Sequence, residues 1–326
     1  MFSKRPRVKI CVPVFVSLDV NRCSLNSKVV WFLQRNQLAQ QKPYMKAFSF
    51  RISVLLFIAC IYPSYGTTQE KVAMPVSYSA ITELPYTDAD STLDYGDDIS
   101  QFIQVWRPSE PPQGNLVFIH GGCWLSDYDI KHARPFMSAL SKLGYQVFGI
   151  EYRRVGNGGG WPTSYQDIRS AIQQILREPN VSAPNTAILG HSAGGHLALL
   201  AAADEQLPNT FASVIGLAAI SDIVKYSVGS NSCEVATEQF MGGSFEASTE
   251  AYLAANPVEQ HFLNPVYLLH GADDPIVAPN QSKALTDRAQ SIYLQKEAGH
   301  FDWLHPDTVA FTRVEKLLKD VFNESD

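Results

Sequence analysis

Short apolar runs, each followed by a segment with helical spacing, dominate the chain from residue 76 onward. The apolar runs predict buried strands at 116–119, 146–150, 186–189, 213–217, 265–269 and 291–294. Apolar residues recur at intervals of three and four at 130–143, 168–175, 197–203 and 309–321. Alternating β-branched and aromatic residues predict two antiparallel edge strands, at 76–82 and 101–106. Strands that alternate with helices favour an α/β fold, with a mostly parallel sheet of eight strands and helices on both faces.

One predicted strand leads into an unusual turn. The run 186–189 is followed directly by Gly190-His191-Ser192-Ala193-Gly194, and helical spacing resumes at Leu197. A strand, a tight turn and a helix in this order strain the backbone of the serine and lift its hydroxyl clear of the sheet. The start of the helix places backbone N–H groups beside that hydroxyl, which suits an oxyanion. Ser192 is therefore predicted to be a nucleophile.

A serine hydroxyl needs a base, and a histidine base needs a carboxylate to hold its tautomer. In open α/β sheets these groups lie on loops after the carboxyl ends of strands. His300 follows the last predicted strand, and Asp273 and Asp274 follow the strand at 265–269. We expect Asp274 to be the acid, because its spacing from His270 fits a loop acid, and Asp273 to cap the turn. The order Ser192, Asp274, His300 is the one expected for this architecture.

A third loop supplies candidate oxyanion donors. His120-Gly121-Gly122-Cys123-Trp124 follows the buried strand at 116–119, and consecutive glycines let backbone N–H groups turn toward an oxygen that gains charge. The N–H groups of Gly122, Cys123 and Ala193 are predicted to form the oxyanion hole. Each loop alone would be an ordinary turn. Their combination, in order and each at the end of a predicted strand, favours a serine hydrolase.

The segment 222–262 interrupts the alternation, because it is longer than an ordinary connection. We expect it to be a small insertion over the active site, helical at 248–256. The remaining histidines have simpler interpretations. His191 and His196 are expected to pack or hydrogen-bond locally, and His132 and His261 to lie at the surface. Since His, Cys and carboxylates show no metal-ligand spacing, neither a metal nor a cofactor is expected.

Charge and the N-terminal segment add two constraints. The formal net charge is −6 over 326 residues, so nucleic acid is not an expected partner. A basic lead at 45–51, an apolar core at 52–62 that is too short to span a bilayer, and small residues at 64–66 predict a signal peptide at 45–66. Residues 1–44 would then be an upstream extension outside the mature protein, and 67–326 the catalytic domain.

This interpretation predicts export, to the periplasm or outside the cell, with no stable membrane span after signal removal. A buried core helix is the alternative for 52–62, and acylation of Cys60 is a weaker one because Phe57 sits where lipoprotein signals usually carry leucine. Of the five cysteines, Cys123 and Cys233 would remain in a compartment that permits disulfides. The sequence leaves open whether they pair or stay as two small apolar side chains.

At these residues the chain resembles the α/β-hydrolase superfamily over most of 76–323. The motifs around Gly122 and Ser192 are similar to those of the esterase and kynurenine-formamidase-like branch, which includes aryl formamidases and feruloyl and acetyl-xylan esterases. The resemblance implies the α/β-hydrolase fold, with catalytic residues Ser192, Asp274 and His300 and an oxyanion hole at Gly122, Cys123 and Ala193. It also implies that residues 151–153 support the cleft. Hormone-sensitive-lipase relatives carry a third glycine in place of Cys123, which argues against that subgroup.

The expected activity is hydrolysis of a small carboxylic ester, acyl or aryl, through an acyl-enzyme. An aryl formamidase is the alternative. A peptidase of the prolyl-oligopeptidase type is disfavoured because no propeller-sized region precedes the catalytic domain. A non-catalytic binding module is disfavoured because all three triad residues are present. The natural substrate and the oligomeric state stay open.

Overall fold

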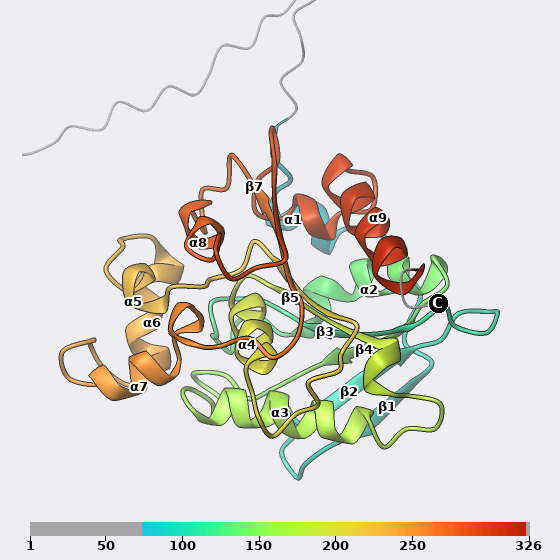
Figure 1. Ribbon diagram of the computed structural model, residues 1–326, viewed down its shortest axis with the longest axis horizontal. Coiled ribbons are helices and arrows are strands. Elements are labelled where there is room, and N and C mark those ends of the chain that lie inside the picture. Colours follow the sequence, from blue (N-terminus) through green and yellow to red (C-terminus); the bar gives the residue numbers. More distant parts are fainter. Residues whose placement is uncertain (1–73, 324–326) are drawn as a thin grey trace, which may run out of the picture. The chain divides into compact units, whose positions relative to one another are not determined.

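The computed structural model describes residues 74–323, so the predicted extension 1–44 and signal peptide 45–66 lie outside the described residues. Within 74–323 the strands form one eight-stranded sheet in the order β1-β2-β4-β3-β5-β6-β7-β8 (Figure 1). In chain order they are β1 (Ser91–Asp94), β2 (Phe102–Trp106), β3 (Asn115–Ile119), β4 (Gln146–Ile150), β5 (Thr186–His191), β6 (Ser213–Leu217), β7 (Val266–Gly271) and β8 (Ser291–Gln295).

The pairing is antiparallel between β1 and β2 and between β2 and β4, and parallel in the rest of this sheet. The predicted α/β fold with eight mostly parallel strands is confirmed. Because β3 to β8 run in one direction, the loops after their carboxyl ends meet at one edge. The chain passes from β3 outward to β4 and then returns to β5 on the other side of β3. Such a reversal opens a crevice at the carboxyl ends of β3 and β5, and ligands bind at such crevices in α/β sheets.

The helices cover both faces of the sheet (Figure 1). They are α1 (Tyr78–Thr82), α2 (Arg134–Lys142), α3 (Thr163–Ile175), α4 (Ala193–Ala202), α5 (Ile223–Tyr226), α6 (Ser232–Met241), α7 (Thr249–Ala254), α8 (Asn280–Lys283) and α9 (Val309–Asn323), with short 3₁₀ helices at Ile130–Ala133, Ala183–Asn185, Pro257–Glu259 and Asp302–Leu304. Among the described residues, none of these helices is both long and apolar enough to cross a bilayer.

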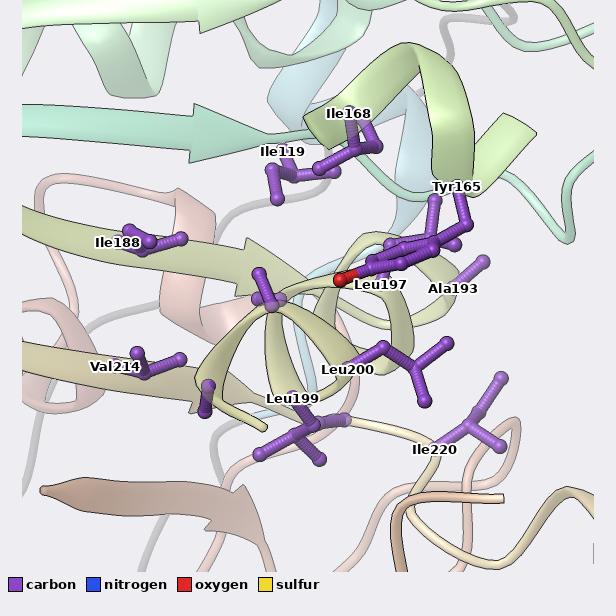
Figure 2. Close-up of a cluster of buried hydrophobic side chains, with 14 of the residues drawn as sticks. Ile119, Tyr165, Ile168, Ile188, Ala193, Leu197, Leu199, Leu200, Val214 and Ile220 are labelled. Carbon is purple, nitrogen blue, oxygen red and sulfur yellow. The ribbon is translucent and has the colours of Figure 1, made fainter. Parts of the chain in front are cut away.

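Alternate residues of the central strands pack on opposite faces of the sheet. In β3, Val117 and Ile119 join the apolar cluster around α3 and α4, whereas Leu116 and Phe118 join the cluster around α2 and α9. Figure 2 shows part of the first cluster, in which side chains of β3, β5 and β6 and of the helices α3 and α4 gather. All five residues of β3 are buried, as the continuous apolar run predicts. Burial on both faces gives the carboxyl-end loops a rigid base.

One predicted edge strand is wrong. Residues 76–82 contain the helix α1, and the strand that pairs with β2 is β1, at Ser91–Asp94. The Ser77 hydroxyl accepts a hydrogen bond from the Ala80 N–H (3.2 Å), which caps α1 at its N-terminus. The sequence of β1 shows no apolar pattern, because it is an edge strand whose residues are half-buried or exposed. The sequence therefore does not predict this strand. The prediction at 101–106 corresponds to β2, which lies second from the edge.

The segment between β6 and β7 is an insertion that contains α5, α6 and α7. The predicted helical stretch at 248–256 contains α7, but the sequence interpretation missed α6. α6 begins with a capping box, in which the Asn231 side chain accepts from the Glu234 N–H (3.0 Å) and the Glu234 carboxylate accepts from the Asn231 N–H (2.8 Å). The first residues of α6 line the pocket described below, so the insertion forms part of its wall.

Candidate active site

Ser192 occupies the turn between β5 and α4 in a backbone conformation that non-glycine residues rarely adopt, with φ of 56°. Its side chain is nearly buried, with 2% of the residue exposed. A Cβ on Gly190 would collide with the backbone of Gly194, and a Cβ on Gly194 with the carbonyls of Ile119 and His120. Strand, turn and helix therefore approach as closely as the sequence motif predicts. Ala193 is the first residue of α4, so its N–H has no partner within the helix.

His300 and Asp274 form a buried pair. The Nδ1 atom of His300 lies 2.8 Å from Oδ2 of Asp274, while Oδ1 of Asp274 accepts hydrogen bonds from the N–H groups of Ile276 (2.8 Å) and Val277 (2.9 Å). Burial raises the pKa of this carboxyl, but hydrogen bonds from His270, His300 and the Val277 N–H outweigh it and hold the pKa below its usual range. The carboxylate is therefore ionised at neutral pH, and Nδ1 of His300 carries the proton that it donates.

The neighbouring Asp273 does something else. It is exposed, and its carboxylate accepts a hydrogen bond from the Glu297 N–H (3.0 Å), which ties its loop to the residues after β8. The structure thus places Asp274, and not Asp273, on His300.

The loop 120–124 lies directly against the Ser192 turn. A Cβ on Gly121 would come within 2.8 Å of the His191 carbonyl oxygen and 3.0 Å of the Ser192 Cβ. The next three residues have left-handed backbones, with φ of 110° at Gly122, 53° at Cys123 and 58° at Trp124. The predicted oxyanion donors Gly122 and Cys123 therefore line the same pocket as Ser192.

Residues after β4 contact this loop and support it, which is the role that the family resemblance implies for 151–153. The Tyr152 hydroxyl donates to the carbonyl of His120 (3.0 Å), and the carboxylate of Glu151 accepts from the Ile130 N–H (2.8 Å) and pairs with the buried guanidinium of Arg154. Arg153 has a different partner, because it pairs with Asp167 at the start of α3 (2.6 Å). Tyr152 thus holds the first residue of the loop in place, and the Glu151 carboxylate lies 3.5 Å from Nε2 of the same His120.

Ser192 and His300 face one cavity of about 270 Å³, although 108 positions separate them in the chain. Its lining also contains residues that the sequence interpretation missed; they are Tyr78, Tyr128, His132, Asn231, Ser232, Ile276 and Phe301. The expectation that His132 lies at the surface is wrong, because it is 6% exposed and its ring packs beside that of His120. The ring of Tyr78 meets the rings of Tyr128 and Phe301 edge to face, with centroids 5.7 Å and 5.6 Å apart.

The histidines that flank Ser192 make local hydrogen bonds, as expected. Nε2 of His191 donates to the carbonyl of His300 (2.9 Å), and Nε2 of His196 donates to that of Ala255 (2.7 Å). Burial, and then the charge of His300, keeps the pKa of His191 well below its usual value. His191 is therefore neutral, and it fixes the backbone of His300 beside the Ser192 turn.

Burial of His196 predicts acid sensitivity. Burial lowers its pKa to about 4, against about 6.5 in an unfolded chain. Between these values the unfolded chain binds a proton that the folded chain does not, so the free energy of unfolding falls as pH falls from 6.5 toward 4. One such proton costs about 1.4 kcal/mol per pH unit. His196→Gln keeps a donor for Ala255 but cannot titrate. Its loss of melting temperature between pH 7 and pH 5 should be smaller than that of the wild type; an equal or larger loss would contradict this explanation.

Cys123 and Cys233 form a disulfide, with Cα atoms 5.0 Å apart. The bond joins the loop 120–124 to the second residue of α6 and resolves the alternatives that the sequence left open. In residues 74–323, His, Cys, Asp and Glu side chains nowhere gather in threes close enough to hold a metal ion. The expectation that the protein needs no metal or cofactor stays a prediction.

An eight-stranded sheet of this order, with a serine at the strained turn after β5, is the α/β-hydrolase fold. Residues 104–289, more than half of the chain, match the model of the BD-FAE family, and the chain belongs to that family. The matched range includes Cys123, Ser192, Cys233 and Asp274 and ends before His300.

Relatives include a formamidase and esterases, and solved structures share the fold. The chain is 26% identical over 249 residues to a kynurenine formamidase of Meyerozyma guilliermondii, covering 70% of this chain and 92% of the relative. It is 25% identical over 239 residues to esterase LipC of Mycobacterium tuberculosis, covering 64% of this chain and 59% of LipC. Among solved structures, esterase B of Lactobacillus rhamnosis shares the fold with a TM-score of 0.63 at 17% identity, covering 76% of this chain and 90% of that one.

Proposed function

We propose that this protein is an exported serine hydrolase that cleaves a small carboxylic ester through an acyl-enzyme. The observation that carries the proposal is the 2.8 Å hydrogen bond between Asp274 and Nδ1 of His300, in a histidine that shares one cavity with Ser192. Since Nδ1 is engaged, Nε2 is the nitrogen left to accept a proton. The three side chains come from loops after β5, β7 and β8, whose carboxyl ends lie at the same edge of the sheet.

The reaction follows from this arrangement. Nε2 of His300 takes the proton of the Ser192 hydroxyl while Oγ attacks the substrate carbonyl carbon, and the carbonyl electrons move to its oxygen. The N–H groups of Gly122, Cys123 and Ala193 bind that oxyanion. His300 then gives its proton to the leaving alcohol, and the acyl group stays on Ser192. A water molecule repeats the sequence and releases the acid. Asp274 stays ionised throughout and stabilises the imidazolium, which its lowered pKa favours.

Ester and formamide substrates pass through the same intermediates, so the site chemistry does not separate them. A cavity of about 270 Å³ limits the group that can sit beside Ser192 to a small one. The esterase relatives support the ester, whereas the formamidase relative, matched over 92% of its length, favours N-formyl aromatic amines as a second candidate.

A substrate panel tests the proposal. Purified protein should hydrolyse short-chain aryl esters with saturation kinetics, and a fluorophosphonate should add once to Ser192. We expect kcat/KM for an aryl acetate or butyrate to exceed that for an N-formyl aromatic amine by at least about tenfold, or about 1.4 kcal/mol of barrier. The reverse order would replace the esterase by a formamidase. A peptidase would instead prefer a peptide amide, and absence of both turnover and labelling would favour a binding module.

Export is supported by the signal-like pattern at 45–66 together with the disulfide, because disulfides persist in oxidising compartments and are rare in reducing ones. Expressed from Met45 in its native host, the protein should be recovered outside the cytoplasm, with an N-terminus near Thr67. Mass spectrometry of the intact protein measures this. A cytoplasmic product that retains 46–66 would contradict export, and a lipid mass on Cys60 would replace it by membrane anchoring.

A further inference from the structure

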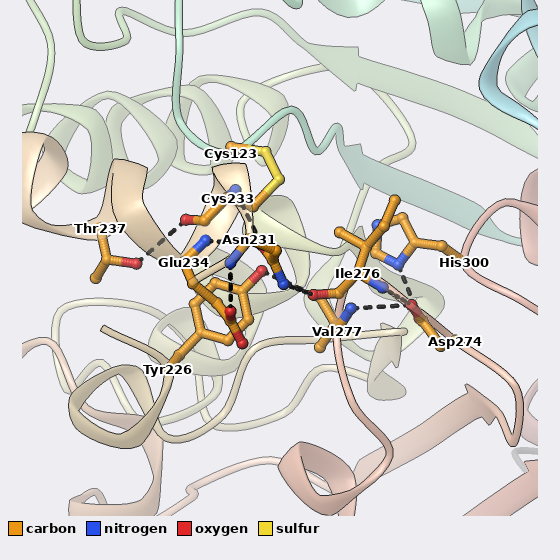
Figure 3. The surroundings of a disulfide bond; sticks show 10 residues. All are labelled: Cys123, Tyr226, Asn231, Cys233, Glu234, Thr237, Asp274, Ile276, Val277 and His300. Carbon is orange, nitrogen blue, oxygen red and sulfur yellow. Dashed lines mark hydrogen bonds and ion pairs between the residues drawn. A yellow bond between two sulfur atoms is a disulfide. The ribbon is translucent and has the colours of Figure 1, made fainter. Parts of the chain in front are cut away.

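The Cys123–Cys233 disulfide joins two parts of the pocket wall that are 110 positions apart in the chain (Figure 3). Cys123 belongs to the loop 120–124, which we call the oxyanion loop, and Cys233 lies in the first turn of α6, within the insertion. Both residues line the cavity that contains Ser192. The cross-link therefore connects the insertion to a residue whose own N–H is a proposed oxyanion donor.

The oxyanion loop needs an external support. Cys123 and Trp124 both have positive φ, which costs a non-glycine residue roughly 1–2 kcal/mol each and persists only where the surroundings enforce it. α6 supplies the surroundings for both. It holds Cys123 through the disulfide, and its Phe240 stacks on the buried indole of Trp124, with ring centroids 4.7 Å apart and planes 13° apart.

α6 is in turn fixed to the loop that carries the acid. The side chain of Asn231, which caps α6, donates to the carbonyl of Ile276 (3.0 Å), and the Tyr226 hydroxyl donates to the same oxygen (3.2 Å). The N–H of Ile276 donates to Asp274, which holds His300. Figure 3 shows this path from the disulfide through Asn231 and Ile276 to the Asp274–His300 pair.

We propose that Cys233 is a positioning residue for catalysis: through the disulfide, α6 fixes the Cys123 N–H relative to the Asp274–His300 pair. The inference rests on the proposed function, because it acts on the oxyanion hole. Donors of an oxyanion hole act on the charge that develops in the transition state, so their displacement lowers kcat more than it raises KM. Breaking the bond should therefore slow the chemical step and leave substrate binding nearly intact.

The test compares variants of the full chain with the reduced wild type. Cys233→Ala removes the bond, and dithiothreitol removes it without mutation, as the dithiol is oxidised to its cyclic disulfide and both cysteines become thiols. Each should lower kcat at least about tenfold, with KM changed less than about threefold, at a temperature where circular dichroism shows the protein folded. Val235→Ala is the matched control, because Val235 lies on α6 but is 54% exposed to solvent. It should leave kcat unchanged.

A second variant separates positioning from general loss of stability. Glycine adopts positive φ without the cost that other residues bear. In the Cys233→Ala background, Cys123→Gly should therefore recover more of kcat than Cys123→Ala does, although neither restores the cross-link. Recovery by glycine is a result that a merely stabilising bond would not give.

The inference would be overturned by free thiols at both positions in the purified native protein, or by a kcat within about twofold of wild type after complete reduction. Equal kcat values for the two Cys123 variants would also overturn it. Each result requires that the wild type hydrolyse esters and bind a fluorophosphonate at Ser192. A wild type that neither hydrolyses esters nor binds a fluorophosphonate would instead overturn the proposed function. Failure of the inference and failure of the proposed function are therefore distinguishable.

Discussion

Replacing Ser192 by alanine should lower kcat for ester hydrolysis by a factor on the order of 10⁶, which is the cost of removing a nucleophile from a triad. The remaining rate would come from oxyanion donors and substrate binding. The fold should survive, because alanine is smaller than serine and the Ser192 side chain makes no capping hydrogen bond to α4. Steady-state kinetics and fluorophosphonate labelling measure the effect.

Ser170→Ala provides the control, since Ser170 is exposed on α3 and does not line the cavity. Its kcat should stay within about twofold of wild type, because surface substitutions away from special features change free energies by at most about 0.5 kcal/mol. If Ser192→Ala kept more than about a hundredth of the wild-type kcat, Ser192 would not be the nucleophile, and the adduct site of the fluorophosphonate would identify the residue that is.

Asp274→Asn should lower kcat by a factor on the order of 10⁴. The asparagine oxygen can still accept from the N–H groups of Ile276 and Val277, which bond Oδ1 of Asp274. Its amide nitrogen then faces Nδ1 of His300, where an acceptor is required. The imidazole must adopt the opposite tautomer, with its proton on Nε2. Nε2 can then no longer accept the proton of Ser192. The loop keeps its shape while the base is disabled.

Asp273→Asn is the matched control at the adjacent residue. It should lower kcat less than about tenfold, which is about 1.4 kcal/mol of barrier. Asp273 bonds the Glu297 N–H at the surface and not His300. The opposite ranking of the two variants would reverse the assignment of the acid. If neither mattered, Asp222 would be the next candidate, although its side chain caps α5 and pairs with Lys225 (2.8 Å).

The sequence predicts the centre of the sheet well because burial on both faces leaves little choice of residue. Leu116 to Ile119 are all apolar for that reason, and Gly190 is required by a backbone contact with Gly194, four positions along the turn. These constraints are local, so they are visible in a single sequence. The choice of Asp274 over Asp273 follows from loop spacing, and the structure places the chosen side chain on His300.

Elements at the periphery are predicted poorly because their surroundings are not local. In 76–82 the alternation of apolar and polar residues resembles a strand, whereas Ser77 caps a short helix there. In α6 the buried face consists of Cys233, Ala236, Thr237, Phe240 and Met241, and its two large apolar side chains are adjacent at the end of the helix, so they show no repeat on their own. The capping residues Asn231 and Glu234, three positions apart, are the sequence signal that could have found the helix.

The pocket lining has no sequence signal of this kind. Tyr78 and Phe301 are 223 positions apart in the chain, yet their rings are in contact. Their meeting depends on α1 packing against the loop after β8, which no spacing within either segment indicates. The candidate catalytic residues can be proposed from sequence because their chemistry is distinctive, whereas residues that shape a cavity are ordinary aromatic and polar side chains.

The insertion between β6 and β7 has a consequence for how such an enzyme can evolve. The chemical groups lie on loops of the sheet, while Asn231, Ser232 and Cys233 bring a separate segment to the pocket. Substitutions at Ser232 can alter selectivity without changing the groups on the sheet loops, and so selectivity and chemistry are largely free to change independently there. Asn231 and the disulfide are exceptions, because the Asn231 side chain bonds the carbonyl of Ile276 in the loop that carries Asp274. Loss of either cysteine leaves the other as a free thiol on the wall of the pocket, so we expect the two cysteines to be inherited or lost together.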